Sequence, residues 1–210
     1  MKVLRMDPSL TNFGWCLVEC SPTEISPIDH GRFQTDSKTL FVDRYISLRE
    51  SVRELISKHN PDKISCEYPI FDNLYSEGMY GLFLFTCEAV RTSKKDIVFF
   101  SPGQGKAHAR LFLDRPKGWK MEKTDMVEAC KLAVGKTWNH NEADAYWISR
   151  AGSRFWMFVE GVLPEEEMTS VEIQQFTKVH TFKKGKRAGQ TKRSGIAYRE
   201  DERFFRWSQE

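Results

Sequence analysis

The sequence has few cysteines, and their spacing suits neither a disulfide framework nor a zinc site. The five are dispersed, and no Cys-x-x-Cys or Cys/His pattern occurs. We therefore expect free thiols in the core of a protein from a reducing compartment. The sequence also lacks a signal-peptide core and any apolar run long enough to span a bilayer. These absences predict a soluble, cytoplasmic protein with no membrane partner.

A strong charge of either sign is missing too, because the formal net charge is only +3. Such a sum says little about partners, since a nucleic-acid binder is recognised by where its charges cluster. Core-forming residues are plentiful: 40% of the residues are hydrophobic, and 15 Phe and 6 Trp are among them. Global disorder is therefore excluded, and 210 residues allow one well-cored domain with an appendage.

Apolar periodicity predicts an α/β domain. Three short strands joined by turn residues are expected to open it as an antiparallel meander, over 3–6, 13–19 and 28–33. Apolar residues then recur at three- and four-residue steps from Phe41 to Leu55, which predicts a helix. Alternating strands and helices follow, and this rhythm implies parallel pairing. The strands are expected over 62–67 and 96–100, and the helices over 74–90, 122–134 and 139–148.

The composition changes near residue 160. We predict a core domain over 1–160 and a basic, weakly structured C-terminal extension over 161–210, with a short helix over 170–176. The extension contains an acid-free tract whose cations include Lys183, Lys184, Lys186 and Arg187. These cations are candidate DNA contacts, because neutralising phosphates gives affinity that does not depend on sequence. The alternative is that the charge run is simply solvated.

Three acidic residues have informative positions. Asp7 ends the first strand, Glu67 ends the strand after the first helix, and Asp144 lies one turn into the last core helix. Adjacent parallel strands end side by side, so these carboxylates are expected to cluster. Oxygen-only ligation indicates Mg²⁺, with Mn²⁺ as a substitute, and two such ions would stabilise both oxygens of an in-line displacement. Each acid alone is more commonly a turn, cap or solvated residue, so the prediction rests on their order.

Three segments of the sequence resemble RuvC-type Holliday junction resolvases. They are Leu-Arg-Met-Asp-Pro-Ser-Leu-Thr-Asn-Phe-Gly-Trp at 4–15, Ile-Ser-Cys-Glu at 64–67 and Asn-Glu-Ala-Asp-Ala at 141–145. The resemblance implies a ribonuclease H-like fold, whose five-stranded mixed sheet has three antiparallel strands followed by parallel ones and is flanked by helices. It also implies a homodimer that nicks four-way DNA junctions with magnesium, and Asp7, Glu67 and Asp144 match the family's catalytic, metal-binding acids. With its divergent tail, the sequence is similar to phage-encoded members.

Several other positions gain candidate roles from the resemblance. Asn141 stands where the family has Asp or His, so it is a candidate catalytic residue and metal ligand, although Asn is also a favoured helix cap. Lys123 matches a family lysine that could contact the scissile phosphate. A solvated helix-end cation is the alternative. Further candidate DNA contacts are Lys106, Lys120 and Phe71, the last beside the family's aromatic wedge. The stretch 80–85 falls on the helix expected at the dimer interface, although an internal helix would look the same.

The leading hypothesis is a magnesium-dependent crossover junction endodeoxyribonuclease that acts on Holliday or otherwise branched DNA in recombination and repair. Recombination or packaging machinery is a further expected partner, and the cytoplasm of a bacterial host is the expected location if the protein is phage-encoded. Two alternatives stay open. One is another ribonuclease H-like nuclease that acts on RNA, hybrids or flap DNA, because the acids address the phosphate rather than the sugar. The other is a non-catalytic branched-DNA-binding protein, which the substitution at Asn141 motivates.

Overall fold

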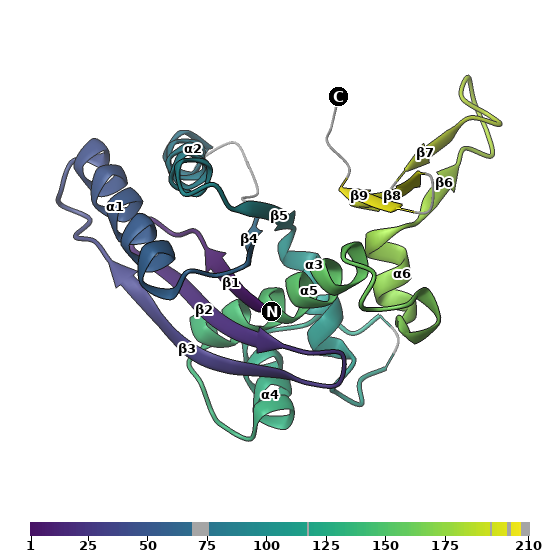
Figure 1. Ribbon diagram of the computed structural model, residues 1–210, viewed down its shortest axis with the longest axis horizontal. Helices are drawn as coiled ribbons and strands as arrows, with labels where there is room; N and C mark the ends of the chain where they lie inside the picture. Colours follow the sequence, from purple (N-terminus) through teal and green to yellow (C-terminus); the bar gives the residue numbers. More distant parts are fainter. Residues whose placement is uncertain (69–75, 117, 194, 201–202, 207–210) are drawn as a thin grey trace. The chain divides into compact units, whose positions relative to one another are not determined.

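A five-stranded mixed sheet is the centre of the computed structural model, which describes residues 1–68, 76–116, 118–193, 195–200 and 203–206 (Figure 1). The strands have the order β3-β2-β1-β4-β5. The first three pair antiparallel, whereas β1 with β4 and β4 with β5 pair parallel. This confirms the predicted meander followed by parallel strands. The strands are β1 (Lys2–Asp7), β2 (Asn12–Cys20), β3 (Ile25–Gln34), β4 (Lys63–Glu67) and β5 (Asp96–Phe100).

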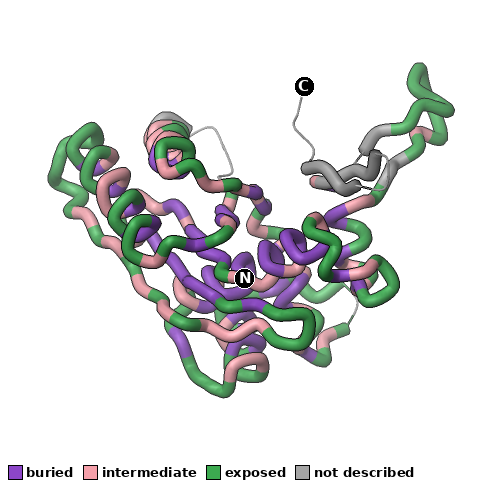
Figure 2. The backbone as a smooth tube through the Cα atoms, viewed as in Figure 1, coloured by how far each residue is buried: buried purple, intermediate pink, exposed green. Residues whose placement is uncertain are grey.

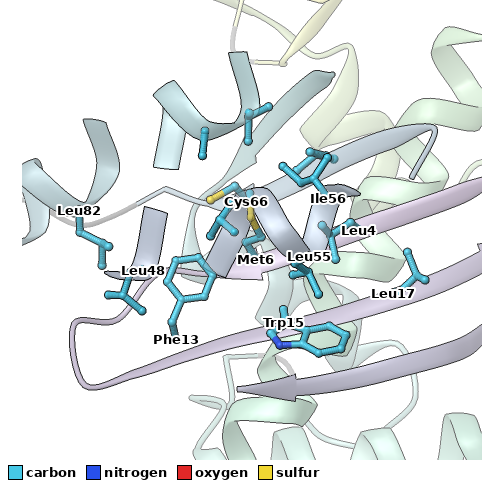
Figure 3. Close-up of a cluster of buried hydrophobic side chains, with 14 residues drawn as sticks. Leu4, Met6, Phe13, Trp15, Leu17, Leu48, Leu55, Ile56, Cys66 and Leu82 are labelled. Atoms are coloured by element: carbon cyan, nitrogen blue, oxygen red, sulfur yellow. The ribbon is translucent and has the colours of Figure 1, made fainter. Parts of the chain in front are cut away.

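Helices cover both faces of the sheet. On one face, Leu4 and Met6 of β1 pack in a buried cluster with residues of α1 (Phe41–His59) and α2 (Ser76–Thr92), such as Leu48 and Leu82 (Figure 3). On the other face lies α5 (His140–Val159): the Ser65 hydroxyl donates to the Ile148 carbonyl, and the Ser149 hydroxyl donates to the Cys16 carbonyl. Buried residues accordingly gather in the strands and along α5 (Figure 2).

The alternation of β1 decides which side chains face the site. Successive side chains of a strand point to opposite faces of the sheet. Because Leu4 and Met6 belong to the cluster with α1 and α2, Arg5 and Asp7 face the side covered by α5. The sheet therefore presents a basic and an acidic side chain of the same strand toward the last core helix.

Helix α3 (Pro102–Arg110) was not predicted from the sequence, which suggested only a turn after β5. Its start has a capping box in which Ser101 and Gln104 satisfy each other's backbone amides, with Pro102 in the first turn. The predicted helix over 122–134 is confirmed as α4 (Lys123–Val134). On α1, Phe41 was expected on the buried face, but it is 58% exposed because it is the first residue of the helix.

The chain divides into two compact units, Met1–Ser153 and Arg154–Glu210, and the boundary falls within α5. In the second unit, the ring of Phe176 contacts the rings of Phe155 and Phe158. The predicted short helix is confirmed as α6, but the prediction of a weakly structured tail is wrong for the described residues. They form η1 (Glu165–Glu167), α6 (Ser170–Phe176) and two antiparallel pairs, β6 (Val179–Thr181) with β7 (Thr191–Arg193) and β8 (Ala197–Glu200) with β9 (Arg203–Arg206).

All five cysteines are free thiols, and four of them are buried, while Cys87 is partly exposed. Burial raises the pKa of the Cys16 thiol to about 12, so this side chain behaves as a small apolar group rather than a nucleophile. Within the described part of the chain, no helix has the length and apolar character needed to cross a membrane.

Candidate active site

The sheet topology brings two of the predicted acids side by side. Asp7 is the last residue of β1, and Glu67 is the last residue of the parallel neighbour β4. The register pairs Met6 with Cys66, so the two acids follow directly on paired residues. Their side chains are 21% and 22% exposed, which leaves them reachable from solvent. The expected convergence of strand ends is therefore present for this pair.

Asp144 comes from α5, which packs on the same face of the sheet. The close packing of the helix is set by Gly105 of α3 and Gly152 of α5, where added β-carbons would meet Ile148 and Ser65 respectively. Asp144 is partly buried in the first turns of the helix. Strand end, strand end and helix thus supply one acid each, in the predicted order.

Electrostatic effects between the acids show that they share one environment. The pKa of Glu67 is raised to about 8, first by burial and then by the negative charges of Asp7 and Asp144. The pKa of Asp144 is also raised, mainly by burial, with a further contribution from Asp7. Burial raises the pKa of Asp7 as well. The three carboxylates therefore repel one another, and a nearby cation would relieve that repulsion.

A buried arginine lies directly beside two of these acids. Nη2 of Arg5 is 3.2 Å from Oε2 of Glu67 and 3.9 Å from Oδ1 of Asp7. The Arg5 side chain is fully buried. Sequence reasoning did not assign it a role, although a charged residue between Leu4 and Met6 in an otherwise apolar strand was a signal that could have found it.

Three more basic side chains act on the acids from the surrounding helices. Lys106 of α3 lowers the pKa of both Glu67 and Asp144, while Lys123 at the start of α4 and His140 at the start of α5 lower that of Asp7. Lys106 is partly buried and Lys123 is exposed. The structure thus brings these two predicted lysines to the acids, whereas Lys120 is an exposed residue that precedes α4.

The interpretation of Asn141 as a helix cap is wrong. Asn139 precedes α5, and its side-chain oxygen accepts a hydrogen bond from the Glu142 amide at 3.0 Å. The Glu142 carboxylate accepts from the Asn139 amide at 3.2 Å, which completes a reciprocal capping box. Asn141 lies within the helix, and a β-carbon placed on Gly14 would be 3.5 Å from its carbonyl oxygen and 3.5 Å from Cβ of Asp7. Asn141 is thus near the first acid, and its role as a ligand stays a prediction.

The predicted metal site is not confirmed by the arrangement of the side chains. Among the residues that the structure describes, no three His, Cys, Asp or Glu side chains are grouped so that they could hold one ion. The donor chemistry nevertheless fits a hard divalent cation, because the candidate ligands of Asp7, Glu67 and Asp144 are carboxylate oxygens. The Arg5 guanidinium stands where an ion between Asp7 and Glu67 would have to be accommodated.

Other predicted DNA contacts lie outside this cluster. Lys183, Lys184, Lys186 and Arg187 are exposed in the connection between β6 and β7. The Arg187 guanidinium stacks 4.2 Å from the ring centroid of Phe182, and backbone hydrogen bonds between Phe182, Gly189 and Gln190 close the loop. Phe71 lies outside the described residues.

Comparisons with known proteins agree on one class. No protein-family model matches the chain. A crossover junction endodeoxyribonuclease RuvC from Sphingopyxis alaskensis is 36% identical over 150 residues, which covers 64% of this chain and 95% of the relative. RuvC proteins from Erythrobacter litoralis and Caulobacter vibrioides are 31% and 32% identical over shorter matches of 65 and 66 residues. The chain spans only 40% and 39% of the length of these two relatives.

Solved structures with a similar fold include Thermus thermophilus RuvC in complex with a Holliday junction substrate, with a TM-score of 0.62 and 15% identity. That match covers 77% of this chain and 98% of the other. The yeast mitochondrial Holliday junction resolvase has a TM-score of 0.53 at 14% identity and covers 70% of this chain and 75% of its own. At these identities the likeness shows the fold alone.

Sheet order, flanking helices and strand-end acids define a protein with the ribonuclease H-like fold of Holliday junction resolvases. The extent and identity of the match to the Sphingopyxis relative go further. The chain belongs to the RuvC family of crossover junction endodeoxyribonucleases.

Proposed function

We propose that this protein is a divalent-metal-dependent endonuclease that nicks four-way or otherwise branched DNA. The observation that carries the proposal is that Asp7 and Glu67 end two paired parallel strands on the face of the sheet against which the helix of Asp144 packs. Burial, and then the charges of Asp7 and Asp144, raise the pKa of Glu67 to about 8. Carboxylate oxygens in this arrangement suit a hard cation and, through it, a phosphodiester. Membership of the RuvC family supports the nuclease chemistry and the branched substrate.

In the proposed mechanism, Asp7, Glu67 and Asp144 would hold Mg²⁺, or Mn²⁺ as a substitute, and the Asn141 amide oxygen is a further candidate ligand. When bound, the metal supplies Lewis-acid stabilisation of the phosphate and activation of water. Lys106 and Lys123 flank the acids from two helices, where they attract and orient the negatively charged backbone and balance the charge that develops on the phosphate oxygens.

The proposed sequence-independent contacts with DNA come from positively charged side chains outside the acid cluster. Lys183, Lys184, Lys186 and Arg187 are exposed on one closed loop, so they can approach phosphates without regard to base sequence. Lys120 and Phe71 are retained as further proposed contacts. We place the core nuclease domain in residues 1–160 and this basic extension in 161–210.

A homodimer is part of the proposal, because two active sites are needed to nick two strands of one junction. Helix α2 is the proposed interface, since Leu84 and Tyr80 are 49% and 53% exposed on it. Sedimentation equilibrium on the purified chain tests this step. A monomer at the concentrations used for cleavage would contradict it.

The decisive experiment is cleavage of a synthetic four-way junction by the wild-type protein in Mg²⁺, Mn²⁺ and Ca²⁺. Asp7→Asn should abolish nicking in Mg²⁺ while junction binding is kept. Asp96→Asn is the matched control, because Asp96 begins β5 and forms an ion pair with Lys63, away from the carboxyl ends of the strands. If wild type and Asp7→Asn nick at the same rate, the catalytic assignment is wrong. Matched DNA, RNA, hybrid and flap substrates test the other ribonuclease H-like activities.

One observation favours a second candidate, a branched-DNA-binding protein without catalysis. Asn141 replaces an acidic or basic family position, and the described side chains do not form a three-ligand metal group as they stand. This candidate predicts tight junction binding in EDTA and no nicking in any divalent ion. Magnesium-dependent nicking by the wild-type protein would exclude it.

A further inference from the structure

We infer that Arg5 is a resident cation of the acidic site, which pairs with Glu67 and Asp7 in the absence of metal and competes with a divalent ion for these two carboxylates. The inference rests on the proposed metal-dependent function and concerns a residue to which that function assigned no role. It follows from the burial of Arg5, from how its guanidinium is bonded, and from the charges around it.

The burial of Arg5 is unusual for a charged side chain. It is fully buried in the middle of β1, at the sheet face that α5 covers. A buried guanidinium is tolerated only where opposite charge or hydrogen bonds compensate the loss of water. The compensation here comes from Glu67 and Asp7, both through the single nitrogen Nη2.

The bonding of Arg5 differs from that of the other well-buried arginines. Its Nε and Nη1 are buried, and among the described residues they have no hydrogen-bond partner. By contrast, Arg44 bonds three neutral oxygens, and Arg154 forms a two-pronged pair with the carboxylate of Glu172. A structural arginine would be satisfied as these two are. Arg5 instead leaves two of its nitrogens without a hydrogen-bond partner among the described residues, and its contacts with the acids are mainly ionic.

The position of Arg5 opposes metal binding at the same acids. Its Nη2 lies 3.2 Å from Glu67 and 3.9 Å from Asp7, and the side chain is fully buried. A divalent ion held by these two carboxylates would therefore lie close to a fixed positive charge, which weakens its binding.

The geometry agrees with this assignment. Nη2 donates a hydrogen bond to Glu67 and lies 3.9 Å from Asp7, and the acids among the described residues are not grouped around a common point as a metal would group them. Loading one ion therefore requires the carboxylates to turn partly from the guanidinium. Removing the guanidinium would free both carboxylates for metal.

Calcium titration calorimetry on the full chain tests the inference, with Ca²⁺ as the probe because binding can be followed without DNA. Arg5→Met should bind Ca²⁺ about tenfold tighter than wild type or more, because a competing positive charge is gone. Arg5→Lys keeps the charge and should bind Ca²⁺ about as weakly as wild type.

Thermal unfolding supplies a second readout that is independent of calorimetry. Without metal, Arg5→Met should unfold at a lower temperature than wild type, and Ca²⁺ should raise its melting temperature by more than it raises that of wild type. Arg154→Met is the matched control: it also strips a buried carboxylate of its arginine, but its response to Ca²⁺ should equal that of wild type.

Two results would overturn the role of Arg5. One is an Arg5→Met protein that matches wild type in Ca²⁺ affinity and in thermal response. The other is an Arg5→Gln protein with the Ca²⁺ affinity of wild type, which decides the matter if Arg5→Met fails to fold, because glutamine keeps a hydrogen-bond donor and loses the charge. If wild type still nicks junctions in Mg²⁺, only this inference fails. If wild type neither binds Ca²⁺ nor nicks in Mg²⁺, the proposed metal-dependent function fails together with it.

Discussion

Gly152 of α5 packs so closely on Ser65 of β4 that a β-carbon at position 152 would overlap the serine side chain. Two residues after Ser65, β4 ends in Glu67, and two turns before Gly152, α5 carries Asp144. The contact therefore fixes how closely the helix approaches the sheet, and with it the distance between the second and third acids. Gly105 likewise sets how closely α3 approaches α5, since a β-carbon there would meet Ile148 of α5.

Substituting Gly152 should consequently damage both stability and activity. Gly152→Ala is expected to lower the free energy of unfolding by about 1–3 kcal/mol, because the overpacked helix must shift away from β4. Nicking should fall further than the loss of folded protein explains, since Asp144 moves with the helix. Urea unfolding and junction cleavage at a temperature where the variant is folded measure the two effects.

The control for this prediction is Gly103→Ala. Gly103 is also helical, but the nearest atom to an added β-carbon is 4.0 Å away. Alanine is the better helix former, so this variant should be equally or more stable than wild type by up to about 1 kcal/mol. Equal stability of Gly152→Ala and wild type would contradict the packing argument.

Much of the fold could be predicted because its signals are local. Alternating and three-to-four-residue apolar patterns located all five strands of the sheet and α1, α2, α4 and α5. Helix α3 was missed, since its nine residues are too few for a periodic pattern and Pro-Gly suggests a turn. The β6–β7 pair was missed because its strands are three residues long and mostly polar.

The candidate site was predictable in part, and for a different reason. The order of Asp7, Glu67 and Asp144 along strand, strand and helix is visible in the sequence, and so is the likeness to RuvC-type resolvases. The contact between Arg5 and Glu67 joins residues that lie 62 positions apart, so only the parallel register of β1 and β4 reveals it. The choice between Asn139 and Asn141 as the cap likewise needed the actual first residue of α5, because helix ends are poorly fixed by sequence.

The metal-free protein should lose stability as the pH rises. The pKa of Glu67 is raised from 4.5 to about 8 in the folded state, so over that window the native protein holds a proton that the unfolded chain releases. The stabilising effect is therefore complete below about pH 4.5 and is lost as the pH passes about 8. The raised pKa values of Asp7 and Asp144 act in the same direction.

Melting temperatures in EDTA between about pH 5 and pH 9 test this pH dependence. Glu67→Gln should flatten the decline, because glutamine stays neutral throughout. Saturating Ca²⁺ should reverse it, since metal binds the ionised carboxylates better. A wild-type melting temperature that rises between about pH 5 and pH 8 in EDTA would contradict the shared environment of the acids.

Alanine substitutions of the two asparagines near the start of α5 should lower the stability of the protein by different amounts. Asn139→Ala removes the side chain that accepts from the Glu142 amide and should lower the free energy of unfolding by about 1 kcal/mol. Asn141→Ala removes no cap and should cost less. If Asn141 is a metal ligand, its alanine variant should instead weaken Ca²⁺ binding in calorimetry. Equal stability losses for the two variants would contradict the assignment of Asn139 as the cap.

Junction binding should depend on salt through the loop between β6 and β7. Four exposed cations lie there, and each phosphate contact contributes about 0.9 to the slope of log affinity against log salt concentration. Replacing Lys183, Lys184, Lys186 and Arg187 with glutamine should therefore reduce that slope by up to about 3.6 if all four contact phosphates. Binding of catalytically impaired Asp7→Asn to a labelled junction in EDTA measures it without cleavage.

The control removes the same number of positive charges from another exposed surface, with Lys38, Lys58, Lys94 and Lys131 changed to glutamine. Those lysines are spread along the chain, two in turns and two in helices, so their loss lowers the net charge equally without removing the charge of any one loop. The loop variant should lose more of the salt slope than this control does. Equal slopes would mean that total charge, rather than the β6–β7 loop, attracts the junction. Melting curves of both variants should match wild type, because every substituted side chain is exposed.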